Sequence, residues 1–481
     1  MVAMSGLRQK LIEEIALPRC RIGTIRSPCL KADLPLNRSV DTFDGKTFAD
    51  LEMMGIRTNI LAWRPRLGLI SAAVMLVAAL CVRVGVVLTH PDFAFPDEKL
   101  YFDIARHVAD ENRYQLSPGS PFHAIRQAPG LPLTLGVLGK VAHLTPSRAK
   151  LLNGLVSVLM SMAYAGAVWR LTRNLLAVNA VILLTAFHPT VLYTSVTNYP
   201  QTFQGLWLAL LTLTLAGVVI RPNAGPARPG LISGLLIGIG ALYVPTEVFV
   251  VPAVVAFFWR RGWRWLAGFV LFLGIGLAVA VTPWTLRNLI MEKEFIVFST
   301  CGGEQFYWGF NEQAGMNTDS RMKIPPAMEK EVFAARSGRE SERIFLTHAT
   351  SWVRENKAQA VRLWALKFLN YFRWDNGEMT TKSEYSRSRE WIARLTTLVV
   401  FGLALWGSWR LWTTERAWTV LTIVLFVCLA AGHAFFTACY RYRLPYEPFL
   451  LFMGTIGCFR LRETTATVDE SGHDGEGQRT I

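Results

Sequence analysis

Long apolar runs recur along most of the 481-residue sequence and constrain its fold more than any other feature. A transmembrane helix needs about 20 consecutive apolar residues to cross a bilayer. The run at 231–259 is too long for one crossing and is broken at Val244-Pro245-Thr246, so it predicts two short helices that meet near the outer face. The sequence thus predicts an all-α polytopic membrane protein with about ten transmembrane helices and both termini inside. The runs occupy residues 67–89, 149–169, 175–196, 203–220, 231–259, 266–284, 391–411, 418–438 and 445–459.

Basic residues are concentrated in the short stretches between these runs. Lys and Arg number 50 against 35 Asp and Glu, and the resulting net charge of +15 would also suit a nucleic-acid partner. Short cytoplasmic loops of membrane proteins are rich in Lys and Arg, so we assign the charge to membrane orientation and expect no nucleic-acid partner. Two longer segments of mixed charge, 92–149 and 288–390, are then extracytoplasmic. The basic loops contain Arg64 and Arg66, Arg170 and Arg173, Arg221 and Arg228, Arg260, Arg261 and Arg264, Arg410 and Arg416, and Arg460 and Arg462.

The sequence divides into three parts. Residues 1–63 are polar and contain no apolar core of signal-peptide length, so they are expected to be a flexible cytoplasmic tail, with Met54 as an alternative start. The membrane domain is expected at 64–460 and a disordered cytoplasmic tail at 461–481. In the outer segments, the patterns at 98–110 and 351–372 predict amphipathic helices that lie in the membrane interface. The seven cysteines are scattered and predict neither a disulfide framework nor a metal site.

The most distinctive local motif is an acidic pair, Asp97 and Glu98, which comes directly after the first apolar run and is followed by Tyr101. Carboxylates at a membrane rim can serve as a general base, because partial burial and neighbouring charges tune them. The structural alternative is that Asp97 caps the following helix while Glu98 favours its N-terminal dipole. Local sequence alone leaves both roles open.

Arginines stand at three further places on the outer side. Arg126 precedes a Pro/Gly turn, and Arg287 with Asn288 follows Pro283-Trp284 at the end of an apolar run, before the Gly-Gly turn expected at 302–303. Each is either an interface anchor or a phosphate ligand, since the planar guanidinium binds phosphate at two points.

Arg441 and Arg443 lie in the short loop between the last two runs. Arginines in a short outer loop oppose the positive-inside tendency, which favours a bound anion. Arg83, inside the first run, is expected to snorkel towards the interface.

Taken in order, these motifs resemble those of GT-C glycosyltransferases of the protein-mannosyltransferase and aminoarabinose-transferase type. The resemblance rests on four features: the acidic pair with its tyrosine, Arg-x-x-Pro-Gly-x-Pro at 126–132, Pro-Trp-x-x-Arg-Asn at 283–288 with its Ser-Thr-x-Gly-Gly sequel, and Arg-Tyr-Arg-Leu-Pro at 441–445. It covers roughly residues 67–460. Many relatives carry an acidic residue where this chain reads Asn198-Tyr199-Pro200-Gln201, and Arg-Pro where it reads Val244-Pro245.

The resemblance implies an inverting glycosyltransferase of the plasma (inner) membrane. It would move a sugar from a polyprenyl-phosphate carrier to a lipid, glycan or protein acceptor on the extracytoplasmic face. The resemblance also implies Asp97 as the catalytic base, with Glu98 beside it. The implied substrate-binding residues are Tyr101, Arg126, Arg287, Asn288, Arg441 and Arg443, and the scheme needs no metal or other cofactor.

Two other classes of membrane protein remain as alternatives. A polymerase or ligase of lipid-linked polysaccharide would also use large outer segments and arginines, and only the position of the acidic pair favours the transferase. A transporter should show paired repeats and ionisable groups near the bilayer midplane, whereas the distinctive charges here gather at the outer face.

Overall fold

The computed structural model describes residues 56–93, 95–115, 126–221, 223–316, 323–374, 387–438, 440–459 and 461. Most of the expected tail at 1–63, including Met54, and nearly all of the tail at 461–481 lie outside these residues. Contacts divide the chain into a unit that ends at Ile60 and a unit formed by Leu61–Ile481. The architecture below is that of the second unit.

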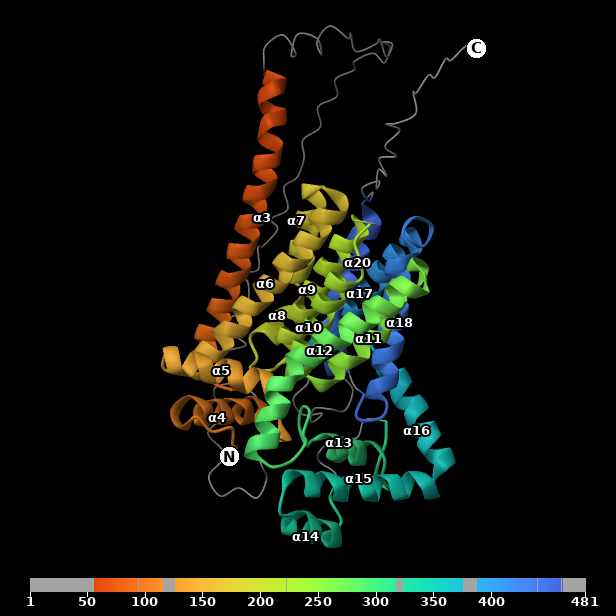
Figure 1. Cartoon of the computed structure of the whole chain (residues 1–481). Coiled ribbons are helices and arrows are strands. Elements are labelled where there is room, and N and C mark those ends of the chain that lie inside the picture. Colours follow the sequence, from red (N-terminus) through yellow and green to blue (C-terminus); the bar gives the residue numbers. More distant parts are fainter. Residues whose placement is uncertain are drawn as a thin grey trace, which may run out of the picture. The chain divides into compact units, whose positions relative to one another are not determined.

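Every regular element of the described ranges is a helix, which confirms the all-α class (Figure 1). Several helices begin with a proline, whose fixed φ and missing N–H suit the first helical turn. In chain order the elements are α3 (Ile56–Thr89), α4 (Pro96–Glu111), α5 (Gly130–Val141), α6 (Pro146–Thr172), α7 (Leu175–Ala186), α8 (Pro189–Ser195), α9 (Gln201–Val219), α10 (Ala227–Tyr243), η2 (Pro245–Val250), α11 (Val251–Phe257), η3 (Trp259–Arg261), α12 (Trp263–Met291), α13 (Gly302–Gly309), α14 (Pro326–Ala334), α15 (Gly338–Glu355), α16 (Lys357–Asn370), α17 (Arg387–Thr414), α18 (Arg416–His433), α19 (Tyr440–Arg443), η4 (Leu444–Tyr446) and α20 (Glu447–Cys458).

Six described helices are long and apolar enough to cross a membrane: α3, α6, α9, α12, α17 and α18. A seventh candidate span is the pair α7 and α8, which is bent by 59° at the break before Pro189. The remaining expected spans are shorter helices: α10 has 17 residues and α20 has 12. The break at Val244 divides the run at 231–259 into α10 and η2–α11, as the sequence predicted.

The helices that meet the length criterion are therefore fewer than the ten expected spans. The other expected spans can be shorter because they pack against neighbouring helices. All but the last residue of α20 is buried. An interrupted or short helix is tolerated in a membrane where protein surrounds it, because its backbone ends are then satisfied by neighbouring groups.

Glycines allow the helices α10 and α12 to touch backbone to backbone. A Cβ added to Gly234 of α10 would lie 2.0 Å from the Leu273 carbonyl oxygen of α12. A Cβ on Gly276 of α12 would lie 2.3 Å from the Leu231 carbonyl oxygen of α10. Close approach through small residues is the usual way in which membrane helices pack, since lipid provides no hydrophobic drive between them.

Both expected outer segments contribute helices to one end of the bundle (Figure 1). We call α4, α5 and α13 to α16 the cap. The two segments meet in the ion pair between Arg126 and Glu304. Tyr114 of the first segment also contacts Trp284, near the end of α12, with ring centroids 4.9 Å apart. The structure therefore gathers the motifs of both segments at the same end.

The cap helices match one of the two amphipathic predictions and correct the other. The pattern at 98–110 corresponds to α4, which buries Ile104 and Val108. The pattern at 351–372 is not one helix, because α15 ends at Glu355 and α16 begins at Lys357. Asn356 accounts for the break, since its φ of −119° and ψ of 44° are not helical.

Candidate functional site

An ion pair joins two predicted site residues that are far apart in the sequence. Asp97, in the first turn of α4, lies 3.6 Å from Arg441 of α19, measured from Oδ2 to Nη1. The Asp97 side chain is 57% exposed and that of Arg441 is 34% exposed. We call this pair, with the side chains around it, the Asp97–Arg441 site. A solvent-facing carboxylate beside a guanidinium can accept a proton and neutralise an anion at one place.

The two members of the acidic pair have different surroundings. Glu98 is completely buried. Its Oε1 accepts a hydrogen bond of 3.1 Å from the Phe95 backbone N–H, and its Oε2 accepts one of 2.6 Å from the Asn198 N–H. The Asn198 amide in turn donates to the Glu98 carbonyl oxygen over 3.2 Å. Glu98 therefore closes the start of α4 and ties it to the segment before α9.

This arrangement shows that the structural alternative for Asp97, capping of α4, is wrong. The N-cap position is Phe95, and the carboxylate that returns to the Phe95 N–H belongs to Glu98. Asp97 is left on the exposed side of the first turn, next to Arg441.

Tyrosines surround the ion pair. The Arg441 guanidinium lies over the Tyr199 ring, 3.9 Å from its centroid, and Tyr199 is 7% exposed. Burial raises the pKa of both the Tyr101 and the Tyr199 phenols, although the nearby Arg441 opposes the rise in each case. Both side chains are therefore neutral at physiological pH and offer ring faces and hydroxyl donors.

Arg126 lies at a second position in the cap. Its Nε donates a 2.8 Å bond to Oε2 of Glu304, and its Nη2 donates to Oε1 of the same carboxylate. The Trp308 indole N–H also donates to Glu304, over 3.3 Å. Arg126 and Glu304 border a cavity of about 200 Å³ that is also lined by Thr300, Ser341 and Phe345.

The Gly-Gly pair beside Arg126 is not the expected turn, because α13 begins at Gly302. A Cβ on Gly303 would lie 2.3 Å from the Glu342 carbonyl oxygen, so the glycine permits close packing of α13 on α15. Cys301 precedes this helix, and burial raises the pKa of its thiol to about 11.

Arg287 and Asn288 stand at the end of α12. Arg287 donates to Glu292 over 2.7 Å and lies over the Trp284 ring, 5.3 Å from its centroid. Asn288 is completely buried and donates to the Ile296 carbonyl oxygen over 2.9 Å. Asn288 thus shapes the loop between α12 and α13, while Arg287 remains partly exposed.

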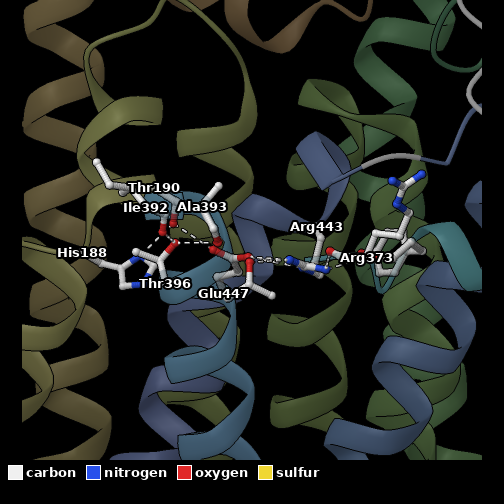
Figure 2. Close-up of polar contacts among 10 residues, drawn as sticks. His188, Thr190, Arg373, Ile392, Ala393, Thr396, Arg443 and Glu447 are labelled. Carbon is white, nitrogen blue, oxygen red and sulfur yellow. Dashed lines mark hydrogen bonds and ion pairs between the residues drawn. The ribbon is translucent and has the colours of Figure 1, made fainter. Parts of the chain in front are cut away.

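Arg443 faces away from the Asp97–Arg441 site into the bundle. Figure 2 shows its guanidinium between Glu447 and the end of α16. Its side chain is fully buried, and it contacts Oε1 of Glu447 at 3.2 Å. It also donates to the carbonyl oxygens of Tyr371 and Arg373 at 3.1 and 2.7 Å.

The network continues beyond Glu447. Oε2 of Glu447 accepts a 2.8 Å bond from Thr190, whose hydroxyl is 2.7 Å from Nδ1 of His188 (Figure 2). Arg443 therefore takes part in a buried network that joins α8, α16, α17 and α20. The structure does not bring it to Asp97. The contact with α17 is made to the Thr397 hydroxyl.

Of the predicted site residues, the structure brings Asp97, Tyr101 and Arg441 together. Arg126 pairs instead with Glu304, and Arg287 with Glu292. Sequence reasoning did not assign Tyr199 or Asn198 to the site. Both residues follow the apolar run at 175–196, whose other end adjoins the basic loop with Arg170 and Arg173. This position could have placed them on the outer side. Within the described ranges, no group of three or more His, Cys, Asp or Glu side chains is arranged to hold a metal ion.

No protein-family model and no curated protein matches the chain. Solved structures with a similar arrangement of helices include the archaeal oligosaccharyltransferase AglB from Archaeoglobus fulgidus in complex with an inhibitory peptide and a dolichol-phosphate, at 12% identity and a TM-score of 0.48. They also include ArnT from Cupriavidus metallidurans bound to undecaprenyl phosphate, at 15% identity and a TM-score of 0.42. Each match covers 80% of this chain, which spans 50% of the AglB chain and 78% of the ArnT chain. Similarity at this level assigns neither a family nor an activity to the chain.

Proposed function

We propose that this chain is an integral membrane glycosyltransferase that moves a sugar from a polyprenyl-phosphate carrier to an acceptor hydroxyl at the Asp97–Arg441 site. The observation that carries the proposal is the exposed Asp97 carboxylate 3.6 Å from Arg441, at the end of a membrane-spanning bundle. A lipid-linked substrate reaches such a site by moving along the membrane surface.

The proposed reaction is a single displacement. Asp97 takes the proton of the acceptor hydroxyl, and the acceptor oxygen forms a bond to the anomeric carbon as the bond from that carbon to the phosphate oxygen breaks. Attack from the face opposite to the leaving group inverts the anomeric centre. Arg441 stabilises the negative charge that develops on the departing polyprenyl phosphate.

The other residues divide into two groups. Tyr101, Arg126 and Arg287 are partly exposed and remain proposed contacts for the donor or the acceptor. Glu98 and Arg443 are fully buried and hydrogen-bonded to backbone groups of other elements, so we assign them positioning roles. Arg443 lies two residues after Arg441 and anchors the short helix that presents it. We propose no metal or other cofactor.

The positions of the basic loops support an extracytoplasmic site. α12 runs for 29 residues from Trp263 to Met291, and its C-terminal end leads into the cap. Arg260 and Arg261 precede its other end, so they lie across the bundle from the cap. Short basic loops mark the cytoplasmic side of a membrane protein, which supports placing the cap on the opposite side of the plasma (inner) membrane.

A transporter would use ionisable groups inside the bundle, and the structure does contain some. Arg83 does not snorkel, because it is 1% exposed and donates to Ser157 and to two backbone carbonyls. Glu247 accepts hydrogen bonds from Gln204 and Tyr446 at 2.9 and 3.0 Å. These contacts join neighbouring helices, as polar groups in membrane bundles commonly do, and they favour a structural role over an ion pathway.

A polymerase or ligase would use the same site with a longer glycan as donor or acceptor, so the products distinguish it. The test uses purified full-length protein in detergent with polyprenyl-phosphate sugars extracted from cell envelopes. Release of free polyprenyl phosphate is measured by mass spectrometry, together with envelope glycans from cells with and without the protein. Sugar-dependent release and loss of one glycan modification are expected. Failure to consume any lipid-linked sugar would contradict the proposal.

A further inference from the structure

Arg441 of the Asp97–Arg441 site rests on an aromatic platform. The carbon of its guanidinium lies 3.9 Å from the centroid of the Tyr199 ring. A cation within about 6 Å of a ring face is attracted by the negative face of the π-system. Other arginines of the chain lie over aromatic rings at longer distances, such as Arg287 over Trp284 at 5.3 Å.

The platform itself is held from several sides. Tyr199 lies between α8 and α9, where the N–H of its neighbour Asn198 donates to the buried Glu98 carboxylate over 2.6 Å. On its other side Pro200 stands at the N-cap of α9. The Phe95 ring lies 6.0 Å from the Tyr199 ring, between centroids. A ring fixed in this way can fix the cation above it.

The contact with the Tyr199 ring orients the N–H donors of the Arg441 guanidinium. Stacking on a ring engages the flat face of the guanidinium, whereas its N–H donors point outward in the plane of the group. A planar edge is the part of arginine that binds phosphate at two points. Burial raises the pKa of the Tyr199 phenol, so the ring stays neutral and does not supply a competing anion.

We propose that Tyr199 is a positioning residue that holds Arg441 by its flat face and directs its N–H edge to the phosphate of the polyprenyl carrier. This inference rests on the proposed function and assigns a part of its donor site. Tyr199 acts through Arg441, so its effect on the carrier must disappear when the arginine is absent.

The experiment keeps the shape of the ring and changes only its electrostatics. Position 199 of the full-length protein is replaced by phenylalanine and by phenylalanines with one, two and three ring fluorines, which progressively weaken the negative face. Binding of undecaprenyl phosphate without sugar is measured in detergent. Tyr199→Phe is expected to bind nearly as the wild type does. The fluorinated series is expected to weaken stepwise to about 3- to 30-fold, the range of a cation–π contact.

Two controls separate positioning from general packing. In an Arg441→Met background the fluorinated series should give constant affinity, whereas a purely structural effect would persist. Phe295 lies in the loop before α13 and is 60% exposed, and Phe295→Leu is expected to leave binding unchanged.

Because the fluorinated rings have nearly the same shape as phenylalanine, the comparison does not depend on a variant that changes the packing at position 199. Equal affinity across the series with a wild type that binds would overturn the role of Tyr199 and leave the proposed function standing. A wild type that does not bind undecaprenyl phosphate would overturn both.

Discussion

Replacing Glu98 by glutamine is expected to destabilise the fold, whereas replacing its neighbour Asp97 by asparagine is not. The buried Glu98 carboxylate accepts backbone hydrogen bonds from Phe95 and Asn198. A glutamine side chain has one carbonyl oxygen, and its other terminal atom is itself a donor. One of the two backbone N–H groups would therefore lose its acceptor and face another N–H group.

The cost follows from burial. Leaving a buried donor without a partner costs about 1–3 kcal/mol, and hydrogen bonds to a charged acceptor lie at the upper end. Asp97 is 57% exposed, and its exposed ion pair with Arg441 contributes at most about 1 kcal/mol. We therefore expect Glu98→Gln to reduce the free energy of unfolding by about 2–3 kcal/mol and Asp97→Asn to reduce it by less than about 1 kcal/mol.

The assay is equilibrium unfolding of both purified variants in mixed micelles with an increasing fraction of SDS. Equal losses, or a larger loss for Asp97→Asn, would refute the division of the acidic pair into a buried positioning residue and an exposed reactive one.

Three further predictions concern packing, topology and thiol reactivity. Gly234→Ala should lower stability by about 1–3 kcal/mol, because its Cβ would overlap the backbone of α12, whereas Gly274→Ala meets no atom within 4 Å and should be neutral or slightly stabilising in the same unfolding assay. In a cysteine-free background, a membrane-impermeant maleimide added outside intact cells should label Ala327→Cys in the cap and spare Asn223→Cys in the short loop after α9; the reverse pattern would contradict the orientation. The raised pKa of Cys301, about 11, leaves little thiolate at neutral pH, so its alkylation rate should rise about tenfold per pH unit up to that value, and a rate that levels off near pH 8 would contradict it.

The membrane class and the common location of the motifs were predictable from the sequence, because the apolar runs and the basic loops carry that information locally. The different roles of Asp97 and Glu98 were not predictable, since the second hydrogen-bond partner of Glu98 is a backbone amide 100 residues away. The local spacing of residues did indicate that Glu98 is buried. Glu98 stands four residues before Phe102 and seven before Ala105, and all three share the buried side of α4.

Arg441 and Arg443 contact different partners because they lie on a short helix, whereas the sequence predicted a loop. The sequence predicted a loop with two arginines facing one anion, whereas the structure forms the short helix α19 over Tyr440–Arg443. Residues two apart on a helix point in nearly opposite directions, at roughly 200° for 3.6 residues per turn. One arginine therefore faces the site and the other faces Glu447.

The central claim is that Asp97 is the base of sugar transfer, and single-turnover transfer from a labelled polyprenyl-phosphate sugar tests it most directly. Asp97→Asn keeps the shape of the side chain and removes the proton acceptor. We expect it to fold, to bind the carrier and to lose about two to four orders of magnitude in transfer rate. Asp110→Asn, on the exposed side of the same helix, is the matched control and should transfer at the wild-type rate. Near-normal transfer by Asp97→Asn would remove Asp97 from the mechanism.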